Sequence, residues 1–325
     1  MTGLQMTPER RLVVASGRSH PTLAEDLARH VGVELSPVVA RDFANGEIYV
    51  RFGESVRGAD VFVVQACHEP MNRWLMEALI MTDAAKRASA KRITAVLPFY
   101  PYARQDKKHR GREPISARLV SDLFLAAGAH RLMTVDLHTA QVQGFFDGPV
   151  DHLFALPLLA DHVERCYDTD RVTVVAPDAG RVRVAERWTD RLASPLAIIH
   201  KRRDKDTPNK VRHFEVVGEV EGRTCVIVDD MIDTGSTLIS AAEALLEQGA
   251  AEVVATATHG VLSGDAVARL RDSALSEVVV TDTLPIRDAD TWDRLKVLPI
   301  AELLARAVRE VFSDGSVTSL FDGDS

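Results

Sequence analysis

The stretch VDDMIDTGST, residues 228–237, has the clearest chemical potential in the sequence. Two adjacent acids, Asp229 and Asp230, close a run of aliphatic residues, and a Thr-Gly-Ser-Thr segment (234–237) leads into a helical pattern. Backbone N–H groups and hydroxyls at a helix N-terminus readily surround an anion. The segment therefore predicts a phosphate site, with acids beside it for sugar hydroxyls or a magnesium-bridged ligand. A capped turn uses the same residue types, but the whole string favours a phosphate loop.

A second stretch, PFYPYARQDKKHRGREPISARLVSDL (98–123), concentrates positive charge. It carries six Lys and Arg residues against three acids, and Phe and Tyr residues precede the basic run. Guanidinium groups offer planar pairs of donors to phosphate oxygens, and ammonium groups offer a point charge. The composition favours a loop that closes over a polyphosphate. A solvated charged loop or a nucleic-acid patch would use the same residues.

Four shorter segments add further candidates, each of which also has an ordinary structural explanation. Asn-Gly favours a hairpin turn, a lone His is commonly a packing residue, and a row of basic residues is usually a solvated edge. The segments are RDFANGEIYVRF (41–52), TVDLHTAQVQGFFD (134–147) with His138, VVAPDAGRVR (174–183) with Asp178, and IIHKRRDKD (198–206) with Lys201, Arg202 and Arg203.

The elements that must position these residues follow from the apolar pattern. Continuous aliphatic runs, typical of strands covered on both faces, occur at 11–16, 61–66, 92–99, 131–138, 171–178, 196–201, 224–230, 252–259 and 277–282. Amphipathic patterns predict helices at 21–31, 71–88, 114–127, 156–166, 180–192, 236–248, 265–272 and 300–312. Their alternation predicts an α/β fold with mainly parallel sheets.

A weak internal repeat indicates two similar halves. A helix, a break of small residues and a strand recur at RASAKRITAVL, AAGAHRLMTVDL and EQGAAEVVATAT, and Gly and Pro interrupt the pattern near 148–157. Ligands of open parallel sheets bind at the carboxyl ends of strands. The polar residues expected there are Asp136, His138, Asp178, Lys201, Asp229 and Asp230.

Composition excludes several classes of protein. The chain has 325 residues, 46% hydrophobic and 26% charged, which is typical of a folded protein with room for two domains. No run approaches the roughly 18–20 apolar residues of a membrane helix, and the first residues lack a signal-peptide pattern. The three cysteines lie far apart, which favours a reducing cytoplasm over a disulfide framework or zinc cluster. A net charge of −8 argues against general binding to nucleic acid or an anionic membrane.

The motifs together resemble those of ribose-phosphate pyrophosphokinases. The string at 228–237 resembles their ribose 5-phosphate loop, which phosphoribosyltransferases share in a looser form. PYARQD (101–106) separates the two families, because it resembles the nucleotide segment of the pyrophosphokinases and ordinary phosphoribosyltransferases lack it. The Asp-Leu-His segment, Lys-Arg-Arg and VVGEVEG (216–222) follow in the family's order, and the resemblance runs from about residue 9 to about 312.

The resemblance implies two similar phosphoribosyltransferase-like domains, each a mainly parallel sheet flanked by helices. The first would span 9–150 and carry the ATP loop, joined by the C-terminal helix; the second would span 151–312 and carry the ribose 5-phosphate loop; 313–325 would be a tail. Departures from the family pattern are Asn45 (usually Asp), Arg181 (usually a second glycine), His200 (often Asp) and Ser236. The Arg181 side chain could narrow the backbone approach or supply a phosphate contact, and the sequence leaves both open.

By resemblance, each candidate residue acquires a role. The ATP site would comprise Phe43, Asn45, Gly46, Glu47, Arg104, Gln105 and His138. The ribose 5-phosphate site would comprise Arg203, Asp229, Asp233, Thr234, Gly235, Ser236 and Thr237. Mg²⁺ would be held by His138 and Asp178, and Lys201 and Arg203 would be catalytic.

The implied reaction transfers the β,γ-diphosphate of MgATP to the 1-hydroxyl of D-ribose 5-phosphate, giving 5-phospho-α-D-ribose 1-diphosphate and AMP for nucleotide, histidine and tryptophan synthesis. The family forms hexamers built from dimers, with an adenine site completed by a neighbouring subunit, so a homo-oligomer is expected. Three alternatives remain: a non-catalytic regulatory homologue, an ordinary phosphoribosyltransferase, and a nucleic-acid-binding module.

Overall fold

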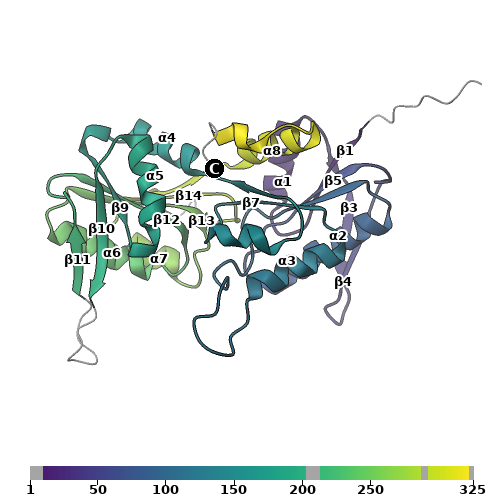
Figure 1. Cartoon of the computed structure of the whole chain (residues 1–325), viewed down its shortest axis with the longest axis horizontal. Coiled ribbons are helices and arrows are strands. Elements are labelled where there is room, and N and C mark those ends of the chain that lie inside the picture. Colours follow the sequence, from purple (N-terminus) through teal and green to yellow (C-terminus); the bar gives the residue numbers. More distant parts are fainter. Residues whose placement is uncertain (1–9, 203–212, 287–291, 322–325) are drawn as a thin grey trace, which may run out of the picture. The chain divides into compact units, whose positions relative to one another are not determined.

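Strands and helices alternate along the chain, which forms two units in a computed structural model (Figure 1). The structure describes residues 10–202, 213–286 and 292–321, without the side chains of 201–202 and 213–214. Unit 1 comprises the described residues of Met1–Leu153 and Ile300–Ser325, and unit 2 those of Phe154–Pro299.

The main sheet of unit 1 is parallel throughout, with strand order β2-β1-β5-β6-β7-β8. Its strands are β1 (Leu12–Ser16), β2 (Leu35–Ser36), β5 (Asp60–Val64), β6 (Arg92–Val96), β7 (Arg131–Val135) and β8 (Val150–Leu153). A separate antiparallel hairpin is made by β3 (Val38–Asp42) and β4 (Ile48–Phe52). Helices cover both faces of the main sheet, as a buried parallel sheet requires.

On one face of that sheet, α1 (Pro21–Val31) packs against α8 (Ala301–Phe312), and α2 (Met71–Arg87) and α3 (Ser116–Ala127) lie on the other (Figure 1). The last helix of the chain therefore belongs to unit 1. Beyond it, Asp314 accepts ion pairs from Arg10 and Arg92, and a 3₁₀ helix follows at Val317–Phe321.

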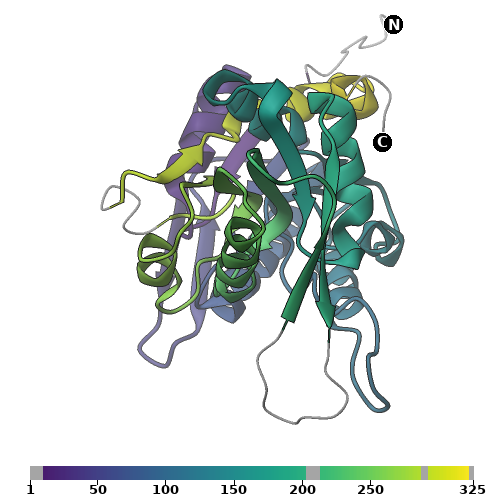
Figure 2. The ribbon, with the colours of Figure 1, turned by 90° about the vertical axis from the view of Figure 1, so that its left-hand side faces the viewer.

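The sheet of unit 2 has the order β11-β10-β9-β12-β13-β14-β15, parallel except for the pair β10–β11. Its strands are β9 (Val172–Ala176), β10 (Leu196–Arg202), β11 (His213–Val217), β12 (Thr224–Ile232), β13 (Glu252–Gly260), β14 (Glu277–Thr281) and β15 (Leu295–Leu298). Figure 2 shows β10 and β11 running together as a two-stranded arm at the edge of this unit.

Helices α4 (Leu156–Cys166) and α5 (Val182–Leu192) cover one face of the unit 2 sheet, and α6 (Ser236–Glu247) and α7 (Ala266–Arg271) cover the other (Figure 1). The core between the sheet and α6 consists of fully buried aliphatic residues such as Ile227, Leu245 and Val253. No helix in the described parts of the chain is long and apolar enough to cross a membrane.

The predicted fold class is confirmed, and each of the nine predicted strands and eight predicted helices has its counterpart. The sequence analysis missed β2, β8, β11 and β15, and it treated the β3–β4 segment only as a turn. The four missed strands are the outer strands of the two large sheets. An outer strand has one neighbour, so it needs no continuous aliphatic run, and the strand pattern is weak there.

Candidate active site

The predicted phosphate loop of unit 2 connects β12 to α6. The sequence places the acids at the end of this strand, but β12 continues through Ile232, because Met231 and Ile232 pair with His259 and Gly260 of β13. Asp229 and Asp230 therefore lie within β12 itself, where pairing with β13 on both sides of them fixes the backbone. The loop that follows is only three residues long, Asp233 to Gly235.

Gly235 makes this tight connection possible. Its φ of +73° lies in the left-handed region, and a Cβ there would come within 3.0 Å of the Leu270 side chain. α6 begins directly afterwards, and the first N–H groups of a helix lack intrahelical acceptors. The exposed hydroxyls of Thr234 and Ser236 lie 3.1 Å apart at the same end of the helix. Together with the helix dipole they give this end of α6 the features that favour an anion.

Arg269 of α7 contacts this site, and the sequence analysis missed it. From α7 it donates a hydrogen bond of 2.8 Å to Ser236 Oγ. Arg269 Nη1 lies 4.0 Å from Asp265 Oδ1, at the limit of an ion pair. The available signal was an Arg in a predicted helix, which by itself indicates only a solvated face.

Arg181, which follows the Asp178–Gly180 turn, contacts both acids of β12. Arg181 Nε lies 2.8 Å from Asp229 Oδ1, and Arg181 Nη2 lies 2.5 Å from Asp230 Oδ1. Burial and the neighbouring Asp230 charge raise the pKa of Asp229, and Arg181 opposes that shift. The Arg181 side chain thus contacts the predicted sugar-binding acids.

The segment before Arg181 forms a turn at the carboxyl end of β9. Asp178 is exposed, and its Oδ1 accepts a 2.8 Å hydrogen bond from the Gly180 N–H. Lys201 lies in β10, paired with Phe214 of β11. Arg203 lies outside the described residues.

In unit 1, the predicted nucleotide segment follows β6. Arg104 and Gln105 are exposed, and Gln105 Oε1 accepts from Ser116 Oγ at 2.7 Å, which ties it to the start of α3. Buried Asp106 accepts hydrogen bonds from Thr139 Oγ1 and Gln141 Nε2. Asp106 therefore connects the basic loop to the segment that contains His138.

His138 is half-buried after β7. Its neighbour Leu137 donates a backbone hydrogen bond of 2.9 Å to His152 Nε2 of β8, and Gln143 contacts His152 Nδ1 at 3.2 Å. The sequence analysis missed Asp106 and His152 as positioning residues, because each role depends on a contact with another strand or loop.

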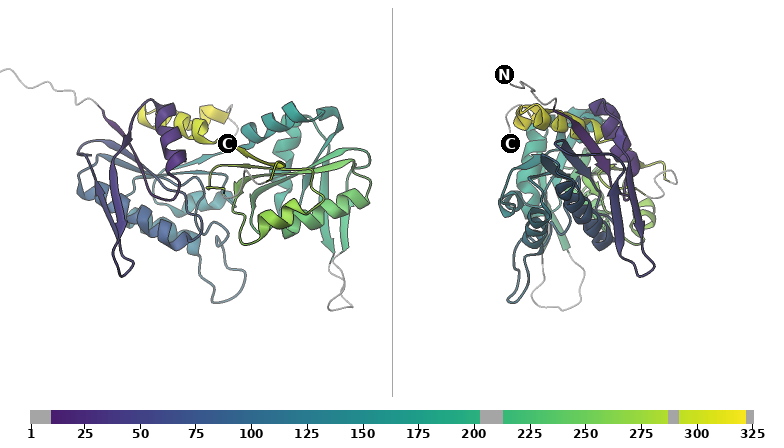
Figure 3. Two further views of the ribbon diagram at one scale, coloured as in Figure 1. Left: turned by 180° about the vertical axis from the view of Figure 1, so that it is seen from behind. Right: turned by 90° about the vertical axis from the view of Figure 1, so that its right-hand side faces the viewer.

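The remaining predicted ATP residues lie at the tip of the β3–β4 hairpin. Gly46 has a φ of +89°, and the Glu47 N–H donates to Asn45 Oδ1 at 3.2 Å. The hairpin interpretation of Asn-Gly is thus confirmed. Phe43 is exposed at the tip and stacks edge-on with Tyr49. This tip and the loop before α3 project separately within unit 1 (Figures 1 and 3), so one chain does not bring them together.

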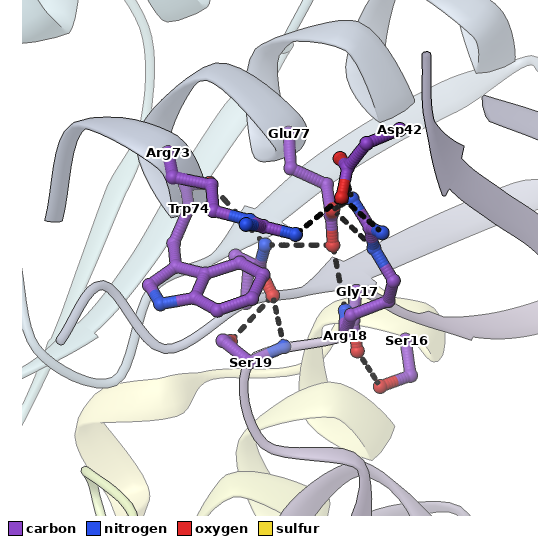
Figure 4. Close-up of polar contacts among 9 residues, drawn as sticks. Ser16, Gly17, Arg18, Ser19, Asp42, Arg73, Trp74 and Glu77 are labelled. Carbon is purple, nitrogen blue, oxygen red and sulfur yellow. Dashed lines mark hydrogen bonds and ion pairs between the residues drawn. The ribbon is translucent and has the colours of Figure 1, made fainter. Parts of the chain in front are cut away.

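A network of ion pairs holds the turn end of strand β3 (Figure 4). Asp42, the last residue of β3, accepts from Arg18 Nη2 at 2.9 Å and from Arg73 of α2. Fully buried Glu77 accepts from the Arg18 N–H at 2.6 Å and from Arg18 Nε at 2.7 Å. The contacts with Arg18 lower the pKa of Asp42.

Two family profiles match the chain. One, described as the N-terminal domain of ribose phosphate pyrophosphokinase, matches residues 12–128, and one, described as the phosphoribosyl synthetase-associated domain, matches residues 203–322. A protein of Streptomyces avermitilis named ribose-phosphate pyrophosphokinase is 63% identical over 322 residues, covering 99% of both chains. The chain belongs to the ribose-phosphate pyrophosphokinase family.

Other relatives agree along the whole length. A ribose-phosphate pyrophosphokinase of Corynebacterium efficiens is 57% identical over 100% of both chains. The crystal structure of phosphoribosylpyrophosphate synthetase from Mycobacterium smegmatis is 56% identical, with a TM-score of 0.89 over 94% of this chain and 100% of that one. The hairpin and the basic loop fall in the first matched profile of the ribose-phosphate pyrophosphokinase family, and the phosphate loop falls in the second.

Proposed function

We propose that this chain catalyses the transfer of the β,γ-diphosphate of MgATP to the 1-hydroxyl of D-ribose 5-phosphate, giving 5-phospho-α-D-ribose 1-diphosphate and AMP. One observation carries the proposal: two acids near the end of β12 precede the short turn with Gly235, which presents the N-terminus of α6 and its hydroxyls. That arrangement suits a sugar phosphate, in a chain of a family named for this chemistry.

Unit 2 would hold the acceptor. The helix end at Ser236 and Thr237, with Thr234, receives the 5-phosphate, because its N–H groups and dipole favour an anion. Asp229 accepts hydrogen bonds from ribose hydroxyls, and Asp233 and Gly235 shape the loop. Arg203 is proposed to contact the sugar phosphate and the transferred group.

Unit 1 would hold the nucleotide. Arg104 and Gln105 are exposed on a loop that Asp106 ties to the His138 segment, which supports a shared role for these three candidates. Phe43, Asn45, Gly46 and Glu47 contact adenine from the tip of the hairpin. Because this tip projects apart from the basic loop, we assign it to the nucleotide of a neighbouring subunit.

The chemical step forms a bond from the sugar O1 to Pβ and breaks the bond from Pβ to the oxygen that bridges it to Pα. The bridging electron pair leaves on AMP, and the hydroxyl proton leaves to solvent. Phosphoryl-type transfer depends on alignment and on neutralisation of charge. Lys201, Arg203 and Arg104 are proposed to neutralise the charge that develops on the β,γ-diphosphate.

Mg²⁺ is proposed as the metal of the nucleotide. The ion prefers oxygen ligands and is usually held by one or two carboxylates together with substrate phosphates and water. The exposed carboxylate of Asp178, oriented by the Gly180 N–H, fits that preference. His138 would offer a nitrogen, which suits direct contact less well. When bound, the ion would lower the negative charge of the phosphates.

A homo-oligomer, with the family's hexamer of dimers as the expected form, is supported by an apolar stripe on unit 1. Ile115, Leu119 and Leu123 recur at a spacing of four residues, and Leu119 is 57% exposed. Met76 of α2 is a further exposed apolar residue of unit 1. Contiguous exposed apolar surface marks protein interfaces, so a second copy is proposed to cover it. Leu119→Glu should lower the mass seen by analytical ultracentrifugation, whereas Thr22→Glu on α1 should not.

The cytoplasm is the proposed compartment. Cys67, Cys166 and Cys225 are all free thiols. These features suit a reducing environment.

The first test follows purified protein with ATP, Mg²⁺ and ribose 5-phosphate by ³¹P NMR, next to Lys201→Ala and the exposed control Lys91→Ala. A new 1-diphosphate signal with equimolar AMP is expected for the parent protein and the control. Loss of one charge-stabilising group should lower kcat by about 10²–10³-fold in Lys201→Ala. Diphosphate formation unaffected by Lys201→Ala would refute the role of this lysine.

Silence from all three folded proteins, with inorganic phosphate present, would refute the proposed reaction. A chain that binds ribose 5-phosphate without turning it over would then be a regulatory homologue. Release of diphosphate from added 5-phosphoribosyl 1-diphosphate in the presence of a nucleobase would instead identify a phosphoribosyltransferase.

A further inference from the structure

Arg181 engages both acids of β12 with one guanidinium. Its Nε and Nη2, the two nitrogens on one side of the planar group, lie 2.8 Å from Asp229 Oδ1 and 2.5 Å from Asp230 Oδ1. The Arg181 side chain is 12% exposed, and those of Asp229 and Asp230 are 21% and 5% exposed. This is a largely buried contact, in which Arg181 holds one oxygen of each carboxylate.

The backbone alone would not produce this arrangement. Successive side chains of a strand point to opposite faces of the sheet, so two consecutive acids do not naturally share a ligand. Here the Asp230 N–H donates to Asp229 Oδ1 at 2.8 Å, and Arg181 donates to the same oxygen. Both contacts end on Oδ1, so a ligand hydroxyl would meet Oδ2 of Asp229.

We propose that Arg181 is a positioning residue that draws Asp229 and Asp230 together into a paired acceptor for the 2- and 3-hydroxyls of the sugar, and so sets the selectivity for ribose 5-phosphate over 2-deoxyribose 5-phosphate. This inference rests on the proposed function, because it assumes that the β12 acids bind the sugar. It gives the Arg181 side chain the role of positioning the two acids of the acceptor site.

The position of Arg181 in its own turn supports the role. Its N–H donates to the Asp178 carbonyl at 3.1 Å, and the 3₁₀ turn Ala179–Arg181 precedes α5 directly. The guanidinium is therefore delivered from a short, hydrogen-bonded segment instead of a long loop. A lysine would keep the charge but would present it from a single nitrogen, without the planar pair of donors that holds the two carboxylates in a fixed geometry.

Charge supports the same role. Two neighbouring carboxylates repel each other, and the pKa of Asp229 is raised by burial and by Asp230. The Arg181 guanidinium opposes that rise and offsets the repulsion between the two carboxylates.

The test compares kcat/KM for ribose 5-phosphate and 2-deoxyribose 5-phosphate in the full-length protein. Variants are Arg181→Gly, which restores the family's glycine, Arg181→Lys, and the control Arg183→Ala, which removes an exposed arginine from the adjoining helix. A hydrogen bond to a charged group is worth enough for a preference of about 10–100-fold for ribose in the parent protein. We expect Arg181→Gly to reduce that preference about tenfold, Arg181→Lys to restore little of it, and Arg183→Ala to leave it unchanged.

An equal loss of kcat/KM for both sugars in Arg181→Gly, or no loss for either, would overturn the inference. If Arg181→Gly does not fold, Arg181→Lys decides, since parental selectivity in that variant also overturns it. Calorimetry measures the same selectivity as the ratio of the Kd values for ribose 5-phosphate and 2-deoxyribose 5-phosphate. An inactive parent protein that binds ribose 5-phosphate with this Arg181-dependent selectivity would refute the proposed reaction and keep the inference.

Discussion

The two units differ in the connection that follows the strand beside their first strand. In unit 2 the strand β12 leads through a short turn into α6, and in unit 1 the strand β5 leads into α2. Each of these strands lies beside the first strand of its unit, and the next strand in the chain pairs on its other side. The turn of unit 2 has left-handed Gly235 and exposed hydroxyls. The turn of unit 1 contains fully buried Cys67 and ends at Pro70, which offers no N–H to an anion.

Side chains of unit 1 occupy the equivalent end of its own sheet. Gln65 accepts from Ser19 Oγ and donates to Glu77 Oε1 at 3.2 Å, and Glu77 binds Arg18 (Figure 4). The polar groups here satisfy one another, whereas those of the β12 turn face solvent. The same strand-to-helix connection is therefore exposed to solvent in unit 2 and closed by an internal ion pair in unit 1.

The largest effect on stability should come from breaking the Arg18–Glu77 ion pair of unit 1. Glu77→Ala removes a fully buried carboxylate and leaves the guanidinium of Arg18 without its inner partner. Removing one member of a buried pair costs about 3 kcal/mol in the free energy of unfolding. Chemical denaturation measures this value. Asp83→Ala on the same helix, which breaks the exposed pair with Arg87, should change it by less than about 0.5 kcal/mol. Equal effects of the two substitutions would show that Glu77 is not a structural anchor.

The second comparison uses two glycines with positive φ. Gly235→Ala places a Cβ 3.0 Å from Leu270, whereas Gly46→Ala meets nothing within 4 Å. The left-handed conformation alone costs about 1 kcal/mol, which we expect for Gly46→Ala. Gly235→Ala should cost about 2 kcal/mol, because the contact adds to the conformational term. It should also raise the KM for ribose 5-phosphate. Thermal unfolding and steady-state kinetics check the pair, and equal stabilities would argue against the close packing of the β12 turn.

The same contrast explains what the sequence could predict. Inner strands such as β12 and β13 are continuous aliphatic runs, because both faces are buried, so their pattern is strong. Outer strands such as β8 and β15 are short and mixed in composition, and were missed. The phosphate loop was recognisable since all its residues are consecutive in the chain.

The contacts that join distant segments were not predictable in this way. Arg181 to Asp229, Arg269 to Ser236 and Asp106 to Thr139 each connect residues more than thirty positions apart. No local periodicity records such a pairing.

A smaller effect, on substrate binding, should come from Arg269 at the β12–α6 turn of unit 2. Arg269→Ala removes the 2.8 Å hydrogen bond to Ser236 Oγ and a positive charge beside the helix end. The arginine is partly exposed, so we expect a loss of about 1 kcal/mol of phosphate binding, or about a fivefold rise in the KM for ribose 5-phosphate. The KM for ATP should stay constant. The matched control is Arg271→Ala on the same helix. A rise in both KM values would indicate a general distortion of unit 2.

The smallest effect concerns protonation of Asp42, at the turn end of β3. Hydrogen bonding to Arg18 lowers the pKa of Asp42 below its ordinary value of 3.8. A carboxyl with a lowered folded-state pKa contributes stability above its unfolded-state pKa and loses that contribution as pH falls through the folded-state value. The melting temperature of the parent protein should therefore fall between about pH 5 and about pH 2 more steeply than that of Asp42→Asn. Asp122→Asn, which breaks an exposed pair with Arg118 on α3, serves as the control and should keep the parental slope. Coincident slopes for the parent protein and Asp42→Asn would mean that the Arg18 contact does not persist in solution, and the hairpin would then depend on Arg73 and on packing against α2.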